Sequence, residues 1–212
     1  MKGNEVADKT HSTAVSTLRL KDVDKSRKAF IAGEPRNLFY LVATELIDLS
    51  RKKITKRVSV AQALAVLLQT WTVSFYRFRG GFHEEDLTKL EALLNDNLAA
   101  IEKYRERSIA RFESSEQEDL RTLFSRFKSV LGAVGAAKCL HLLAPGFFPL
   151  WDNAIAKAYK VKCDEDGYVC FMRIAKEQCR GLEEQGAPWP DVLKAVDEYN
   201  YCIFTLKTGG SI

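Results

Sequence analysis

The chain has 212 residues, 46% of them hydrophobic, and its 32 basic and 28 acidic residues leave a net charge of +4. This length fits one domain or two small packed domains, and the mild positive charge permits a nucleic acid as partner without requiring one. No apolar run reaches the roughly 18 residues of a membrane-spanning helix. The stretch from Met1 to Lys28 lacks the apolar core of a secretory signal. We therefore expect a cytoplasmic, nucleoid-associated or nuclear protein that is not secreted.

The cysteine pattern favours reduced thiols over disulfides or metal ligands. The five cysteines are an odd number and contain no Cys-x-x-Cys pair. A chain of this length does not need a disulfide framework to fold, and zinc sites normally use closely spaced pairs of ligands. We predict no metal site and no cofactor.

Helical patterns dominate the first half of the chain. Residues 1–34 read as an irregular segment, with a short extended piece near residues 14–20. Apolar residues then recur at helical spacing over residues 38–50. After a basic linker at residues 51–57, Ser59 and Gln62 form a capping box. It opens a very apolar helix that we expect to run from residue 60 to about residue 79, before Gly80 and Gly81.

The second half predicts further helices. A long amphipathic helix or a broken pair covers residues 86–111, and a capping box of Ser115 and Glu118 opens a helix that ends near residue 131. Later helices are expected at residues 136–143, 152–159, 168–185 and 192–206. The sequence thus predicts an all-α fold with eight to ten helices. We expect a single domain over residues 35–207 and a frayed tail at residues 208–212.

A run of small residues joins the two helices on either side of residues 131–135, which read Leu-Gly-Ala-Val-Gly. Small side chains let another molecule approach the backbone closely. N–H groups at the start of the following helix can hold a phosphate oxygen. The residues predicted to contact DNA phosphate in this way are Gly132, Val134, Gly135 and Ala136. The alternative is a plain helix–helix turn with glycine as the C-cap.

The linker at residues 51–57 is the densest basic cluster in the chain. Lys52, Lys53 and Arg57 are candidates for phosphate contacts, because lysine and arginine neutralise the DNA backbone. A solvated loop explains the same composition.

Two segments together resemble the helix-hairpin-helix DNA glycosylase superfamily. In that family a small-residue hairpin leads through an apolar helix and a proline-containing loop to an aspartate that caps the next helix. Here residues 131–135 lead to Phe148-Pro-Leu-Trp-Asp152. Residues 65–70, Ala-Val-Leu-Leu-Gln-Thr, resemble an early helix of the family whose polar end lies near the flipped base. The resemblance implies a two-lobed all-α fold that binds double-stranded DNA as a monomer and excises a damaged or modified base.

Asp152 is the central candidate. Cleavage of an N-glycosidic bond builds positive charge on the sugar, and a nearby carboxylate stabilises that charge and can orient or deprotonate a water. The apolar side chains before Asp152 would strengthen the interaction by lowering the local dielectric. The alternative is that Asp152 only caps a helix. The two roles are compatible, because a capping aspartate keeps an oxygen available.

Lys138 is the candidate for a second mechanism. Bifunctional members of the superfamily carry a nucleophilic lysine two residues after the second glycine of the hairpin. Here that position is Ala137, and Lys138 follows one residue later, about 100° further round the helix. We therefore expect a monofunctional enzyme, with Lys138 contacting phosphate or solvent.

A flipped base needs an aromatic face for stacking and polar groups for its edge. The candidates for this base pocket are Gln69, Trp71, Tyr76 and Trp151, and core packing is the alternative for each.

Two other classes of function remain open from the sequence. One is a non-catalytic helical DNA-binding module or a defence-associated interaction module that keeps the same hairpin. The other is a helical protein outside nucleic-acid biology. An interior cleft with Asp152 at its floor would favour the enzyme, whereas a filled interior with Asp152 in open solvent would favour the modules.

Overall fold

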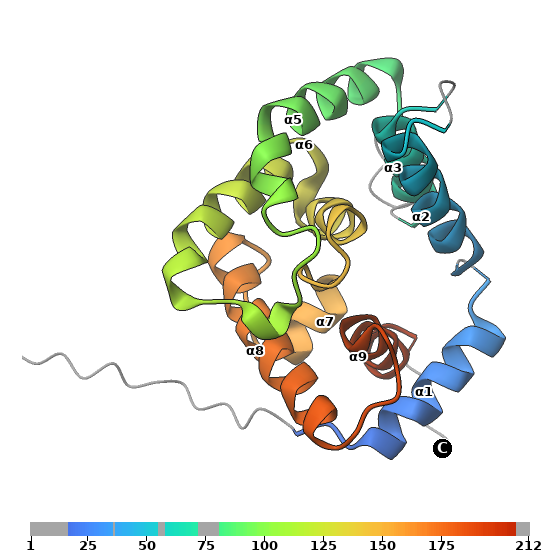
Figure 1. Ribbon diagram of the computed structural model, residues 1–212, viewed down its shortest axis with the longest axis vertical. Helices are drawn as coiled ribbons and strands as arrows, with labels where there is room; N and C mark the ends of the chain where they lie inside the picture. The colour runs from blue at the N-terminus through green and yellow to red at the C-terminus, as the bar shows by residue number, and fades with distance from the viewer. Residues whose placement is uncertain (1–16, 36, 55–57, 72–80, 207–212) are drawn as a thin grey trace, which may run out of the picture.

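The computed structural model describes residues 17–35, 37–54, 58–71 and 81–206 (Figure 1). Eight α-helices and no strand occur in these residues, which confirms the predicted all-α class there. None of these helices is long and apolar enough to cross a membrane. The helices are α1 (Leu20–Gly33), α2 (Asn37–Arg51), α3 (Val60–Trp71), α5 (Glu84–Glu102), α6 (Gln117–Leu143), α7 (Asn153–Ala158), α8 (Glu165–Glu184) and α9 (Val192–Asn200).

Helix α1 corrects the prediction that residues 1–34 are irregular, since residues 20–33 are helical. Val23, Ser26 and Phe30 are its buried residues, three and four positions apart. This stripe is narrow and includes a serine, and the remaining residues are mostly charged, so the sequence alone shows no clear helical period. The helix forms against a distant partner, because α1 packs along α9 near the other end of the chain (Figure 1).

Helices α2 and α3 confirm the two helices predicted in the first half, and they pack against each other. The capping box at the start of α3 is present. The Ser59 N–H donates to Gln62 Oε1 over 2.8 Å, and the Gln62 N–H donates to Ser59 Oγ over 3.1 Å. The helix is described as far as Trp71. The remainder of the predicted helix, residues 72–79, lies outside the described residues.

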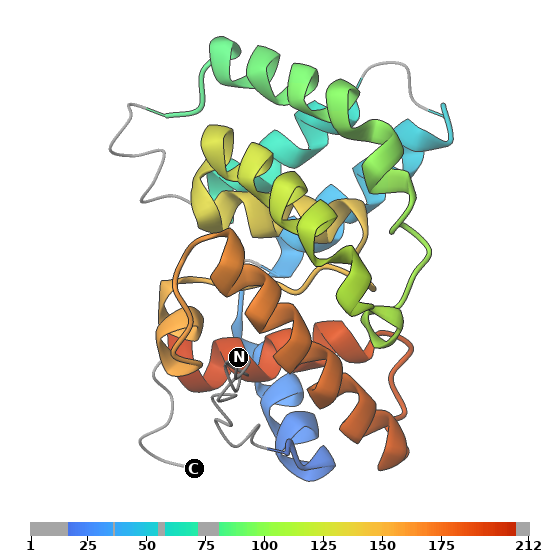
Figure 2. The same cartoon turned by 90° about the vertical axis from the view of Figure 1, so that its left-hand side faces the viewer.

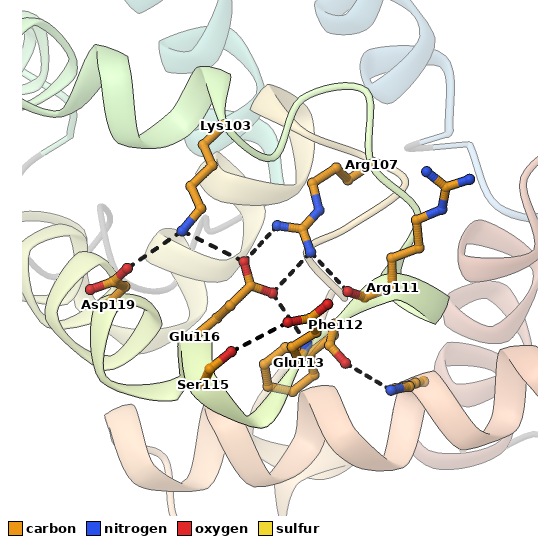
Figure 3. Close-up of polar contacts among 9 residues, drawn as sticks. Lys103, Arg107, Arg111, Phe112, Glu113, Ser115, Glu116 and Asp119 are labelled. Atoms are coloured by element: carbon orange, nitrogen blue, oxygen red, sulfur yellow. Dashed lines mark hydrogen bonds and ion pairs between the residues drawn. The ribbon is translucent and has the colours of Figure 1, made fainter.

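The predicted capping box of Ser115 and Glu118 is wrong by two residues. A 3-10 turn at Ser114–Glu116 precedes α6, and the box is formed by Glu113 and Glu116 instead. The reason is a tertiary partner shown in Figure 3: Arg107 donates to both oxygens of Glu116, over 2.6 and 2.9 Å. These bonds hold the pKa of Glu116 below its ordinary value. The Lys103 ammonium lies 3.6 Å from the same carboxylate, which joins the end of α5 to the start of α6.

Helix α6 is broken at Gly132, whose φ of 70° and ψ of 168° lie outside the helical region. A positive φ is easily adopted by glycine alone, so this residue fixes the position of the break. The two segments of α6 run in different directions (Figure 1). The second begins directly after Gly132 rather than at residue 136, so the joint is shorter than predicted.

The later helices match the predictions with shifted ends. Helix α7 covers residues 153–158 with Asp152 as N-cap. Helix α8 begins three residues before the predicted start, because Asp164 accepts the N–H of Gly167 and caps it there. The helix predicted at residues 192–206 consists of two parts: the α-helix α9 ends at Asn200, and a π-helical segment, η3 (Tyr201–Thr205), follows it directly.

Candidate active site

A cavity of about 620 Å³ lies where the break in α6 faces the start of α7. This volume is within the range of small-molecule sites. Its lining comes from residues 131–135 and 138 of α6, residues 150–155 around the α7 cap, Trp71 of α3, and a wall from α1, α9 and η3. That wall consists of Phe30, Glu34, Asp197, Tyr201 and Thr205. The cavity therefore joins segments from both ends of the chain.

Asp152 lies half-buried in the lining of this cavity, with both carboxylate oxygens held. Its Oδ1 accepts the backbone N–H of Ile155 over 2.9 Å, which is the helix cap that the sequence predicted. Its Oδ2 accepts the hydroxyl of Thr205 over 2.7 Å. A carboxylate has about four acceptor positions, so two such bonds leave it able to bind a water or a ligand. Asp152 is thus a cap and a cavity residue at once.

Thr205 reaches Asp152 from the last position of η3. Two further contacts hold this segment: the Tyr201 hydroxyl donates to Glu34 Oε2 over 2.9 Å, and the Phe204 ring packs 5.6 Å from the Tyr159 ring. Single π-helical turns are frequent at functional sites. The orientation of Asp152 therefore depends on the end of the chain as well as on its own helix.

Lys138 also lines the cavity, despite its offset of one residue from the family's lysine position. Its ammonium donates to the backbone oxygen of Trp71 over 2.5 Å and lies 5.7 Å from the centroid of the Trp71 ring. A second cation, Lys194 of α9, has its ammonium 6.0 Å from the same ring centroid. The indole of Trp71 is therefore held by two lysines as well as by its stacking on Tyr40, at 5.5 Å.

The sequence did not predict a buried ion pair between Lys194 and Asp197, of which Asp197 belongs to the wall of the cavity. Lys194 is 5% exposed, and it donates to Asp197 Oδ2 over 2.8 Å. Its ammonium also lies 4.9 Å from the ring centroid of Phe30. A buried pair of this kind is weak evidence for stability, because the desolvation of both charges offsets their attraction. No local sequence signal marks Asp197, because its place in the cavity depends on the packing of α1 against α9.

Only some of the predicted base-pocket residues are found in the lining of the cavity. Trp71 and Trp151 line the cavity. Trp151 is only 1% exposed, and its indole N–H donates to Ala133 O over 3.3 Å, so it also supports the break in α6. Gln69 is exposed and does not line the cavity. Tyr76 lies outside the described residues.

The residues predicted to contact phosphate also differ in whether they line the cavity. Gly132, Val134 and Gly135 line the cavity, but Ala136 is fully buried behind them and presents no surface to DNA. Lys52 and Lys53 are exposed but do not line the cavity.

The end of α2, where these two lysines lie, is remote from the cavity. Arg51 donates to the backbone oxygen of Leu143 over 3.1 Å, at the end of α6 away from Gly132. At 1.5 Å per residue, the segment between them is about 15 Å long. Figure 2 shows this end of α2 on the side of the molecule opposite α7. Arg57 lies outside the described residues.

His141 lies behind the cavity in a satisfied core position. Its Nε2 is 3.1 Å from the Tyr40 hydroxyl and its Nδ1 is 2.8 Å from the backbone oxygen of Phe148. Burial lowers the pKa of His141, so it remains neutral. It is a structural residue here and not a titrating group of the cavity.

Comparisons with known proteins give no relative for this arrangement: no family model matches the chain, and neither a curated protein nor a solved structure is similar to it. Within the described ranges, no three His, Cys, Asp or Glu side chains are grouped closely enough to hold a metal ion. What the cavity can do must therefore be inferred from its own side chains.

Proposed function

We propose that this chain is a DNA glycosylase of the helix-hairpin-helix type, which hydrolyses the N-glycosidic bond of a damaged or modified base flipped out of duplex DNA. One observation carries the proposal. A single cavity contains the residues around the break in α6, the aspartate that caps α7, and the aromatic side chains of Trp71 and Trp151. This is the combination that the sequence resemblance implies, and the cavity puts Asp152 on its lining rather than in open solvent.

Asp152 would act on the sugar. As the base leaves, positive charge develops on the sugar ring, and a fixed carboxylate within a partly apolar cavity stabilises it more than water would. The bonds from Ile155 and Thr205 hold the carboxylate in one orientation before the substrate arrives. An acceptor position left on Asp152 would take the hydrogen of the attacking water, whose oxygen forms the new bond to the sugar carbon.

The cavity also suits a flipped base. Its volume of about 620 Å³ accommodates a nucleobase, and the rings of Phe30, Trp71 and Tyr201 lie in its lining. Stacking on aromatic rings replaces part of the stacking that the base loses when it leaves the duplex.

Lys138 supports the monofunctional branch of the proposal. A lysine that attacks the sugar must present the lone pair of its nitrogen. In this structure the ammonium donates to the backbone oxygen of Trp71 and lies near its ring. The geometry therefore favours water, and not Lys138, as the group that displaces the base.

The rival is a helical DNA-binding or defence-associated interaction module that keeps the hairpin and uses Asp152 only as a cap. The same cavity argues against it, because a capping aspartate needs neither an aromatic cavity nor a second hydrogen bond from Thr205.

The proposal is tested by incubating the full chain with duplexes that each carry one lesion or modified base, followed by alkali to cleave the abasic sites. Strand cleavage with one or a few bases, abolished in Asp152→Asn, supports the glycosylase. The absence of cleavage with every duplex, together with tight duplex binding, favours the binding module instead.

A further inference from the structure

Three lysines follow Asp152 closely in the sequence and are exposed: Lys157, Lys160 and Lys162. Lys157 belongs to the last turn of α7, and the other two lie in the turn between α7 and α8. None of the three forms an ion pair within the described part of the chain. Unpaired lysines close to a cavity that is proposed to hold DNA need an explanation.

The geometry of α7 connects these lysines to the cavity. Asn153 is exposed and lies on the cavity rim. Lys157 is four residues further on, and residues four apart share a face of a helix. Lys160 follows just after the helix: its N–H donates to Lys157 O over 3.1 Å, and its positive φ of 55° turns the chain there. The stripe is defined as these three lysines, which occupy the end of α7 away from the rim at Asn153 and the turn that follows it.

The acidic groups beside this stripe are already engaged. Asp164 uses its Oδ1 to cap α8. Glu165 is paired with Lys128, and Asp166 lies 2.6 Å from Arg121. Glu165 and Asp166 thus face cations of α6, and none of the three carboxylates forms an ion pair with Lys157 or Lys160. Three lysines without an acidic partner therefore remain at and after the end of α7.

We infer that the stripe formed by Lys157, Lys160 and Lys162 is the surface that binds the DNA backbone beside the flipped nucleotide. The inference rests on the proposed function, because it takes duplex DNA as the partner. It differs from the sequence-based prediction that Lys52 and Lys53 bind phosphate, since the end of α2, which these two lysines follow, lies across the molecule from α7 (Figure 2). A duplex whose nucleotide enters the cavity passes along the rim, and the stripe offers ammonium groups to its phosphates there.

The test compares three charge-matched double variants: Lys157→Glu with Lys160→Glu, Lys52→Glu with Lys53→Glu, and Lys21→Glu with Lys25→Glu. The last pair is exposed on α1, has no ion pair among the described residues and serves as the control. The probe is an undamaged fluorescent duplex, so binding is measured independently of base excision. Affinity is recorded by anisotropy over a series of salt concentrations.

Each phosphate contact contributes about 0.9 to the slope of log affinity against log salt, so losing two contacts lowers the slope by about 1.8. At 0.15 M salt this corresponds to an affinity loss of about thirtyfold. We expect this result for the Lys157 and Lys160 variant, with the α1 control close to wild type. Circular dichroism checks that all three variants remain folded.

The other outcomes separate this inference from the proposed function. Wild-type affinity in the Lys157 and Lys160 variant, or a loss of affinity confined to the Lys52 and Lys53 variant, overturns the DNA-binding role of the stripe. If the chain excises bases, the proposed glycosylase function is retained. A loss of affinity confined to the Lys157 and Lys160 variant, in a chain that excises no base, supports the DNA-binding surface and contradicts the glycosylase function. A wild-type chain that binds no duplex overturns both.

Discussion

Replacing Asp152 with asparagine separates the two roles that the structure gives to this side chain. The amide oxygen of asparagine can still accept the N–H of Ile155, and asparagine caps helices about as well as aspartate. The Thr205 hydroxyl can rotate and accept a hydrogen from the new amide nitrogen. We therefore expect the free energy of unfolding to change by less than about 1 kcal/mol, which is a shift of roughly 2 to 4 °C in Tm at most for a chain of this size.

The catalytic effect of the same change should be much larger. A neutral amide cannot stabilise positive charge on the sugar, and removing one preorganised group of this kind typically lowers the rate about 10²- to 10³-fold. Asp152→Ala should lose a similar factor in rate but also destabilise the chain by about 1 kcal/mol, because the cap is lost. The two variants therefore agree in activity and differ in stability.

The assay is single-turnover excision of the best base from the duplex panel, with thermal unfolding of each variant measured in the same buffer. A loss of rate with an unchanged Tm in Asp152→Asn supports the catalytic role. If Asp152→Asn excises the base at nearly the wild-type rate, the carboxylate is a helix cap and nothing more, and the assignment of the site is wrong.

Three further predictions follow from single contacts. Thr205→Val should lower the single-turnover rate about tenfold to a hundredfold with DNA affinity unchanged, because the hydrogen bond from Thr205 to the Asp152 carboxylate is lost. Thr205→Ser should restore the rate, and the control Thr44→Val on α2 should leave it unchanged. Equal rates in Thr205→Val and wild type would contradict the role of Thr205 in positioning Asp152. Borohydride should trap no efficient covalent adduct with DNA, and Lys138→Ala should keep base excision while weakening DNA binding modestly; a strong adduct that disappears in Lys138→Ala would make this lysine the nucleophile. Glu116→Gln should destabilise the chain by about 1 to 3 kcal/mol near neutral pH. Because Arg107 lowers the pKa of Glu116 in the folded state, the stabilisation is present above the carboxyl pKa of the unfolded chain and is lost as the pH falls through the lower folded pKa; a Tm difference that stays constant into acid would refute this.

Several features could be predicted from the sequence because they depend on neighbours in the chain. The capping box of Ser59 and Gln62 links residues three apart, and the cap of α7 links Asp152 to Ile155. The break in α6 falls at Gly132 because glycine adopts a positive φ without strain. Helices with a broad apolar face, such as α3, can also be recognised from the sequence, because their apolar residues repeat at helical spacing within a few turns.

The exact start of α6 and the existence of α1 were decided by tertiary contacts. Glu116, rather than Glu118, completes the capping box because Arg107 and Lys103 approach it from the end of α5 (Figure 3). Helix α1 buries only a narrow stripe, and its stability comes from packing on α9, which is far away in the sequence.

The site shows the same division. The sequence singled out Asp152 and the residues around Gly132, which line the cavity, because each has a local signature in a turn or a cap. It could not identify Thr205, which lies 53 residues from Asp152, or the pairing of Glu34 with Tyr201 across 167 residues. It also predicted phosphate contacts for Lys52 and Lys53, and the fold leaves both residues outside the lining of the cavity. Local hydrogen bonds and backbone preferences are fixed by adjacent residues, but the shape and charge of a cavity depend on which distant segments pack together.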